Sequence, residues 1–175
     1  MKNTRKRHMI QLRKVNLGDL ETLKYWDQQA HVIACDPNGD WHWEEELARA
    51  PVWRSQFIAE LNGKALGFIQ IIDPRLEDSH YWGTDIGSGK RAIDIWIGEQ
   101  NNLGKGYGTE MMRQALHHCF KDPEVKEVLI DPLETNLKAI RFYKKIGFQF
   151  LEKRTFGLDS CAVYSMKRTD WEKRS

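Results

Sequence analysis

The chain has 175 residues, of which 41% are hydrophobic and 30% are charged, and its formal net charge is +2. Its length predicts a single domain at residues 9–175 behind a basic tail at residues 1–8. The near balance of charge argues against a nucleic-acid binder, and no apolar run approaches the ~20 residues of a membrane span. Three cysteines without metal-ligand spacing favour a reduced, cytoplasmic protein with no metal site.

The N-terminal third is predicted to hold a strand, a helix and an irregular segment. Residues 9–15 alternate apolar and polar side chains, as a half-buried strand does. Asp19 follows a turn and is a suitable cap for the helix that comes next. Residues 31–53 are irregular and rich in Trp, Asp and Glu, with a short helix expected at 44–50.

A hairpin, a loop and a further strand are predicted next. Residues 57–61 and 66–72 have the composition of strands, and Asn62-Gly63 between them is a strong two-residue turn signal. Residues 74–90 contain three glycines and form a loop, and residues 91–99 form the next strand.

Two helices and three strands complete the predicted order. They are a helix at 105–120, a strand at 125–130, a helix at 135–147 and a strand pair at 148–155 and 161–167. A strand, a helix and a strand in succession imply a parallel pair with a right-handed crossover. The expected fold is therefore α/β (α+β), with a mixed, mostly antiparallel sheet, a central parallel pair and helices on both faces.

The most informative segment is Asn-Leu-Gly-Lys-Gly-Tyr-Gly-Thr at residues 102–109, between a strand and a helix. Its three glycines, Gly104, Gly106 and Gly108, leave backbone N–H groups free to point at one ligand. The helix N-terminus behind them adds partial positive charge, so the segment suits a phosphate or pyrophosphate. The spacing matches neither a P-loop nor the dinucleotide motif. A plain flexible connector is the alternative.

This segment resembles the coenzyme A pyrophosphate loop of GNAT acetyltransferases, written Gln/Arg-x-x-Gly-x-Gly/Ala. The motif's glycines fall on Gly106 and Gly108, whereas its first position falls on Leu103, a departure. Residues 131–148 resemble the family's second signature. Over residues 56–167 the chain is similar to aminoglycoside 6′-N-acetyltransferases, which implies the GNAT fold and acetyl-CoA as cosubstrate.

The resemblance implies a cofactor site along one strand, the glycine loop and the second helix. Backbone groups of the strand are expected to bind pantetheine like an added strand. An Asn begins the helix beside the pantetheine arm, and a Tyr lies near the thioester sulfur. The implied cofactor-binding residues are Ile95, Trp96, Ile97, Gly104, Lys105, Gly106, Tyr107, Gly108, Thr109, Asn136, Ala139 and Tyr143.

Acetyl transfer to an amine requires a proton acceptor, but neither a metal nor a covalent enzyme intermediate. Asp94 lies between isoleucines in a predicted strand and shares a face with Trp96. An acid there is costly unless it faces a cleft or finds a partner. A structural Asp paired with Arg or Lys is the alternative. The resembled enzymes have an essential carboxylate here, so Asp94 is expected to bind the amine and accept its proton.

Asp78 and Tyr143 complete the expected catalytic set. The resembled enzymes carry an acid before an aromatic pair, which falls here on Tyr81-Trp82, and Asp78 is the nearest acid although it is one residue out of register. Glu77 and Asp73 are alternatives, and a solvated loop acid is the bland interpretation. Resemblance assigns Tyr143 as the donor to the leaving thiolate; otherwise it is a core tyrosine.

The expected acceptor site is acidic and aromatic. Asp131 ends a parallel strand, where α/β proteins often bind ligands, although Asp131-Pro132 is equally suited to a turn. Resemblance gives Asp131 and, with weaker support, Asp159 a substrate-binding role. Carboxylates attract a polycation and aromatic faces stack on sugars or cations. The expected aromatic contacts are Trp41, Tyr81 and Trp82, unless these rings only pack a loop-rich shell.

The resulting hypothesis is direct acetyl transfer, in a ternary complex, to the 6′-amine of an aminoglycoside. Acetylation of another amine, such as a siderophore precursor or a protein N-terminus, remains open. A coenzyme A sensor without activity is the alternative from another class. The expected partner is a small-molecule amine, not a nucleic acid or a membrane, and the expected state is a monomer or homodimer. Antibiotic resistance and a housekeeping role both remain open.

Overall fold

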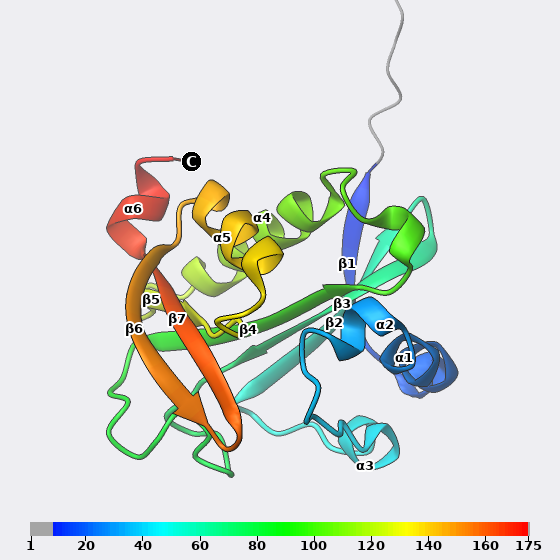
Figure 1. The fold of residues 1–175 in the computed structure, drawn as a ribbon, viewed down its shortest axis with the longest axis horizontal. Coiled ribbons are helices and arrows are strands. Elements are labelled where there is room, and N and C mark those ends of the chain that lie inside the picture. The colour runs from blue at the N-terminus through cyan, green and yellow to red at the C-terminus, as the bar shows by residue number, and fades with distance from the viewer. Residues whose placement is uncertain (1–8, 175) are drawn as a thin grey trace, which may run out of the picture.

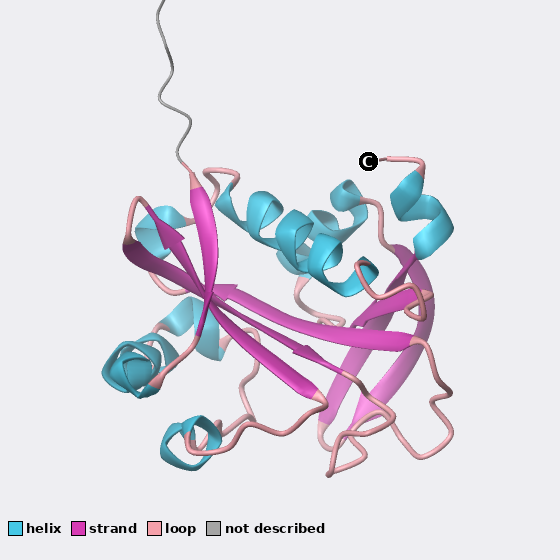
Figure 2. Ribbon diagram, turned by 180° about the vertical axis from the view of Figure 1, so that it is seen from behind, coloured by secondary structure: helices cyan, strands magenta, loops and turns pink. Residues whose placement is uncertain are grey.

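The computed structural model describes residues 9–174, so the predicted tail at 1–8 lies outside the described residues. Seven strands form one sheet in the order β1-β2-β3-β4-β5-β7-β6 (Figures 1 and 2). The strands are β1 Ile10–Lys14, β2 Arg54–Leu61, β3 Lys64–Ile72, β4 Lys90–Ile97, β5 Glu127–Ile130, β6 Gln149–Phe156 and β7 Asp159–Lys167. The α-helices are α1 Leu20–Asp27, α2 Ala30–Ile33, α3 Trp43–Leu47, α4 Tyr107–Phe120, α5 Leu137–Ile146 and α6 Arg168–Glu172, with short 3-10 turns at Leu17–Asp19 and Gln100–Asn102.

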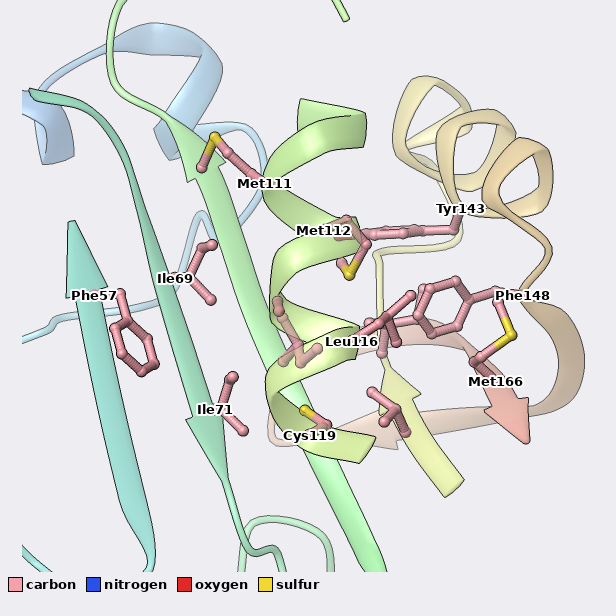
Figure 3. Packing of buried hydrophobic residues seen from close by; sticks show 14 of the residues in the cluster. Phe57, Ile69, Ile71, Met111, Met112, Leu116, Cys119, Tyr143, Phe148 and Met166 are labelled. Atoms are coloured by element: carbon pink, nitrogen blue, oxygen red, sulfur yellow. The ribbon is translucent and has the colours of Figure 1, made fainter. Parts of the chain in front are cut away.

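Helix α4 builds the main core on one face of the sheet. Met112 and Leu116 lie one turn apart on its buried side, and both are fully buried. They belong to the same cluster as Ile69 and Ile71 of β3 and Tyr143 of α5 (Figure 3). The apolar face predicted for this helix is therefore the face that packs on the sheet.

Helices α1 and α3 cover the opposite face. Leu23 and Trp26 of α1 form a separate cluster with Ile58 of β2 and Phe68 of β3. Successive strand residues point to opposite sides, so Phe68 faces this cluster while its neighbour Ile69 faces α4. The predicted arrangement, with helices on both faces of a mixed sheet, is confirmed (Figure 1).

The hairpin turn forms where the sequence predicts it. Leu61 and Lys64 are paired, with Asn62 and Gly63 between them at φ values of 53° and 78°. Both central residues are left-handed, which matches the twist of the flanking strands and explains the Asn-Gly pair.

The parallel pair β4–β5 opens after three residues. Lys90, Arg91 and Ala92 of β4 pair with β5, whereas the rest of β4 continues to Ile97 without a parallel partner in the described residues. β5 itself ends at Ile130 and pairs on its other side with β7. The sheet therefore splits at the carboxyl ends of its parallel strands, where α/β folds commonly bind ligands.

Local expectations near the N-terminus need correction. Asp19 makes no side-chain cap to α1, because its carboxylate accepts two hydrogen bonds from Arg13, at 2.7 and 2.8 Å, and one from the Asn16 N–H. A bidentate arginine outcompetes a single helix N–H for this carboxylate. The segment expected to be irregular also contains α2, and its short helix begins at Trp43 rather than at residue 44.

Candidate active site

Asp94 lies in the middle of β4 at the edge of the split. Its register partner on β3 is Gln70, whose Nε2 donates to Asp94 Oδ2 at 2.9 Å. Gln70 Oε1 in turn accepts from Gln56 Nε2 of β2 at 2.9 Å. Asp94 makes no ion pair with any Lys, Arg or His among the described residues, so the alternative of a structural Asp–Arg or Asp–Lys pair is not what the structure contains. A neutral amide chain holds this carboxyl group instead.

The surroundings of Asp94 tune its proton affinity. Burial and the nearby charge of Asp131 raise the pKa of Asp94 to about 7, while the hydrogen bond from Gln70 acts in the opposite direction. The more distant charge of Asp36 adds to the increase. A general base works best when its pKa lies near the working pH, so Asp94 has the properties that proton transfer requires.

Three further carboxylates lie at the split, and neutral donors hold all three, with the Gly39 backbone N–H as the donor to Asp36. Tyr81 Oη donates to Asp131 Oδ2 at 2.6 Å, and Asn38 Nδ2 donates to Asp159 Oδ1 at 2.6 Å. Asp36 lies between α2 and α3, and burial together with the charge of Asp159 raises its pKa. Burial also raises the pKa of Asp131, with a further contribution from Asp36. The four carboxylates come from four parts of the chain, and together they make this region of the molecule negatively charged.

The three predicted aromatic contacts differ in accessibility. Tyr81 stacks on Phe156 with ring centroids 4.4 Å apart and presents its hydroxyl to Asp131. Trp82 is only 3% exposed and packs in the core beneath Tyr81. Trp41 stacks on Trp43, with ring centroids 4.9 Å apart, and belongs to the cluster between the sheet and helices α1 and α3. Of the three, Tyr81 hydrogen-bonds a carboxylate, whereas Trp41 contacts Trp96, which shares a face of β4 with Asp94.

The acids of the 74–90 loop and its boundary are engaged elsewhere. Asp78 is exposed and pairs with Arg49 at 2.7 Å. Glu77 accepts from the backbone N–H groups of Ser79 and Tyr81, and Asp73 pairs with Arg91 at 3.1 Å. The structure does not bring Asp78 to Asp94, whose charged neighbours are Asp131 and Asp36. The assignment of Asp78 as a base stays a prediction without geometric support.

The free edge of β4 offers backbone groups to the split. The Gly98 N–H donates to Leu66 O at 2.9 Å, so Gly98 faces β3. In an antiparallel ladder this direction alternates, and Ile95 and Ile97 therefore direct their N–H and C=O groups away from β3. His31 Nε2 donates to Ile97 O at 2.8 Å, which fixes α2 to this edge. Because His31 engages the Ile97 carbonyl and the backbone of Trp96 faces β3, the groups of Ile95 and the Ile97 N–H are the ones directed at the split. The cofactor role of residues 95–97 stays a prediction.

The glycine loop is open at the start of α4. Gly104 and Gly106 have φ values of 72° and 83°, and nothing lies within 4 Å of the position of a Cβ on either. Gly106 caps the helix, so the N–H groups of Tyr107, Gly108 and Thr109 have no acceptor within the helix. Lys105 beside them is exposed. This is the geometry expected of a diphosphate-binding turn.

Helix α5 places two predicted residues near the acids. Asn136 caps the helix by accepting from the Ala139 N–H at 3.1 Å, and its Nδ2 contacts Cys35 Sγ at 3.5 Å. Tyr143 is buried on the same helix. Burial, with the nearby Cys35, Asp131 and Asp94, raises the pKa of Tyr143 above its ordinary value. Its hydroxyl thus stays protonated and is available as a donor.

Comparison with known proteins agrees with this geometry. The family model described as an acetyltransferase (GNAT) domain matches residues 16–156. Aminoglycoside N(6′)-acetyltransferase type 1 of Klebsiella pneumoniae is 31% identical over 155 residues, covering 80% of this chain and 74% of that protein. The chain belongs to the GNAT acetyltransferase family. The predicted family, fold class and acetyltransferase activity of the chain are therefore confirmed.

Two further relatives are informative about this GNAT acetyltransferase. The kanamycin resistance protein of Rhizobium radiobacter is 40% identical over 74 residues, or 42% of this chain and 68% of that protein. A crystal structure of aminoglycoside acetyltransferase AAC(6′)-Ib with coenzyme A and kanamycin has a TM-score of 0.82 and 28% identity. That match covers 95% of this chain and all of the other.

Sequence reasoning missed several site residues of this GNAT acetyltransferase. Gln70 and Asn38 are the amide donors to Asp94 and Asp159, His31 holds the β4 edge, and Asp36 joins the carboxylates. The acid-rich composition of residues 31–53 was a signal for Asp36. Within residues 9–174, no group of three or more His, Cys, Asp or Glu is placed to hold a metal ion, and no helix is long and apolar enough to cross a membrane.

Proposed function

We propose that this enzyme transfers the acetyl group of acetyl-CoA to the 6′-amine of an aminoglycoside by direct attack in a ternary complex. The observation that carries the proposal is the unbalanced charge at the split between β4 and β5. Asp36, Asp94, Asp131 and Asp159 gather there, and none forms an ion pair with a cationic side chain of residues 9–174. Their neutral partners leave the negative charge for a polycationic ligand.

The similarity to AAC(6′)-Ib, which has been crystallised with coenzyme A and kanamycin, supports the same class of donor and acceptor. The glycine loop supports the donor, since its open turn and free N–H groups suit the diphosphate of the coenzyme. The β4 edge at Ile95 and Ile97 and the start of α5 at Asn136 would hold the pantetheine arm. We also propose that residues 9–175 form one domain of a cytoplasmic monomer or homodimer.

In this mechanism, Asp94 accepts a proton from the acceptor ammonium, directly or through a water, and so frees the nitrogen lone pair. The amine then attacks the thioester carbonyl carbon, the C–N bond forms and the C–S bond breaks. Backbone N–H groups of the β4 edge are suited to stabilise the charge that develops on the carbonyl oxygen. Tyr143 donates its proton to the departing sulfur. The nitrogen loses a second proton as the C–S bond breaks. Of the two protons that leave the ammonium, one restores the Tyr143 hydroxyl and the other is released to solvent.

A panel of amines, followed by release of free thiol from acetyl-CoA, tests this function. We expect turnover with kanamycin and tobramycin and much weaker turnover with spermine, a siderophore-like monoamine or a peptide N-terminus. Efficient turnover of one of those amines without turnover of any aminoglycoside would assign a different acceptor. Thermal protection by acetyl-CoA with no amine consumed would instead support a coenzyme A sensor.

A further inference from the structure

The segment between α2 and α3 contacts elements on the far side of the split in the sheet. Cys35 Sγ contacts Asn136 Nδ2 at the start of α5, at 3.5 Å. Three residues further on, Asn38 Nδ2 donates to Asp159 Oδ1 at the start of β7, at 2.6 Å. Two polar contacts therefore attach this N-terminal segment to both elements on the far side of the split. Asp36 lies between them in the chain.

The exposed side chain of Asp36 is held by a neighbour in its own turn, because the Gly39 N–H donates to its carboxylate. A Cβ on residue 39 would overlap the Asp36 carboxyl group, so Gly39 leaves the space that this carboxylate occupies. No Lys, Arg or His forms an ion pair with Asp36 in the part of the chain that the structure describes. The charge of Asp36 acts on Asp94 and Asp131, and the charge of Asp159 acts on Asp36, so Asp36 belongs to this group of carboxylates.

We infer that Asp36 is a specificity-determining residue that binds an ammonium group of the acceptor other than the one that is acetylated. This inference rests on the proposed function. Asp94 is assigned to the reacting amine, whereas Asp36 approaches the split from a different element and has no cation of its own. An acceptor with several ammonium groups can satisfy both carboxylates, and one with a single amine cannot. Asp36 thus selects for multiply charged acceptors.

The test compares Asp36→Asn with the matched control Asp40→Asn. Asp40 lies in the same segment, is exposed, and accepts from the His42 N–H, which an Asn can also satisfy. Both variants remove one negative charge. Kinetics with kanamycin and with 6-amino-6-deoxyglucose, which carries a single amine, separate the two roles.

We expect Asp36→Asn to raise KM for kanamycin about tenfold, the equivalent of one lost charge contact, with kcat within about twofold of wild type. KM for the monoamine and for acetyl-CoA should stay within about twofold, and Asp40→Asn should resemble wild type. The effect on kanamycin should shrink at high salt, because accessible charges are screened.

The pH profile supplies a readout that a merely structural residue would not change. The groups that face Asp94 are Gln70 of β3, Tyr81 of the loop before β4, Asp131 after β5, Tyr143 of α5 and Asp36. Because Asp36 raises the pKa of Asp94, its neutralisation should move the acidic limb of kcat/KM to lower pH. The Asp40 variant should not move it.

Several results would overturn the inference. Equal changes in KM for kanamycin and the monoamine, or a fall in kcat alone, would make Asp36 a structural residue only. Turnover of kanamycin with unchanged KM in Asp36→Asn would remove Asp36 and leave the proposed function intact. A wild-type enzyme that acetylates no aminoglycoside would instead overturn the proposed function, and this inference with it.

Discussion

At the scale of single residues, Asp94 differs from the other acids of the molecule in its partners. Asp19 and Asp73 meet arginines, whereas Asp94 meets the amide of Gln70 and the like charge of Asp131. The Gln70 amide orients the carboxylate but does not hold it in the ionised state as an arginine would. The pKa of Asp94 therefore stays near neutral pH. Orientation together with a pKa of about 7 is what a general base needs.

Replacing Asp94 tests its role as proton acceptor. We predict that Asp94→Asn lowers kcat/KM for kanamycin or tobramycin more than tenfold, because the amide keeps the hydrogen bond to Gln70 but cannot accept a proton. In the wild type, activity should rise with pH through about 7, as the carboxyl group ionises. Calorimetry should show unchanged binding of coenzyme A. Unchanged turnover in the purified variant would remove Asp94 from the mechanism.

The same substitution should affect stability with a defined pH dependence. The folded pKa of Asp94, about 7, lies above the ordinary value of about 3.9, so the folded state binds this proton more tightly. The wild type therefore loses stability as pH rises from about 4 to about 7, and the neutral Asn does not. Thermal unfolding without ligands should show Asp94→Asn to be more stable at pH 8, by about 1–3 kcal/mol. A difference that does not vary with pH would contradict the raised pKa.

Tyr143 offers a second test at this scale. Tyr143→Phe keeps the ring contacts with Phe142 and Phe148, whose centroids lie 5.1 and 5.8 Å away, and removes only the hydroxyl. Because burial keeps that hydroxyl protonated, its loss removes the donor to the thiolate. We expect kcat to fall about tenfold or more, with KM for acetyl-CoA nearly unchanged. A variant that loses cofactor affinity but keeps kcat would assign Tyr143 to binding instead.

At the scale of elements, the sequence predicted the features that depend on residues close together in the chain. The Asn62-Gly63 turn and the apolar face of α4 follow from turn chemistry and helical period, whereas the start of α5 at Asn136 was implied by the family resemblance. The glycine loop was also predictable from the sequence, because glycine readily adopts the positive φ values found there and has no side chain to fill the space. Those features account for the coenzyme side of the site.

Long-range contacts decided the features that the sequence did not predict. Asp36 comes from a segment that looks irregular, and it joins the site because Cys35 and Asn38 attach that segment to distant elements. Asp78 pairs at the surface with Arg49, from a separate segment, and is not among the charges that act on Asp94. Trp82 was expected to contact the substrate, but its side chain is buried in the core. None of these long-range contacts can be recognised from a short stretch of the sequence.

The glycine loop provides the prediction for an element. Gly106 and Gly63 both have φ near +80° with open space around the missing Cβ, so replacement by Ala costs each about 1 kcal/mol of stability. Only Gly106 lies at the start of α4, where backbone N–H groups face the expected diphosphate. Gly106→Ala should raise KM for acetyl-CoA about threefold or more, whereas Gly63→Ala should not. Equal KM values in the two variants would show that this turn does not hold the cofactor.

At the scale of the whole molecule, the distribution of charge matters more than its sum. The chain carries a net charge of +2, yet the split between β4 and β5 gathers four carboxylates that form no ion pair among the described residues; the charge of Arg154 acts on one of them, Asp131. The sheet splits where its parallel pair ends, and each half contributes acids to the opening. A cationic acceptor is thus attracted to one place on a nearly neutral protein.

The position of the transferred acetyl group tests this account most directly. Kanamycin incubated with the enzyme and acetyl-CoA carrying a 13C-labelled acetyl group can be examined by NMR and mass spectrometry, alongside release of free thiol. We predict a single acetyl group, bound to the 6′-nitrogen, in equal amount to the thiol released. A label on a different amine, or no labelled kanamycin at all, would contradict the account.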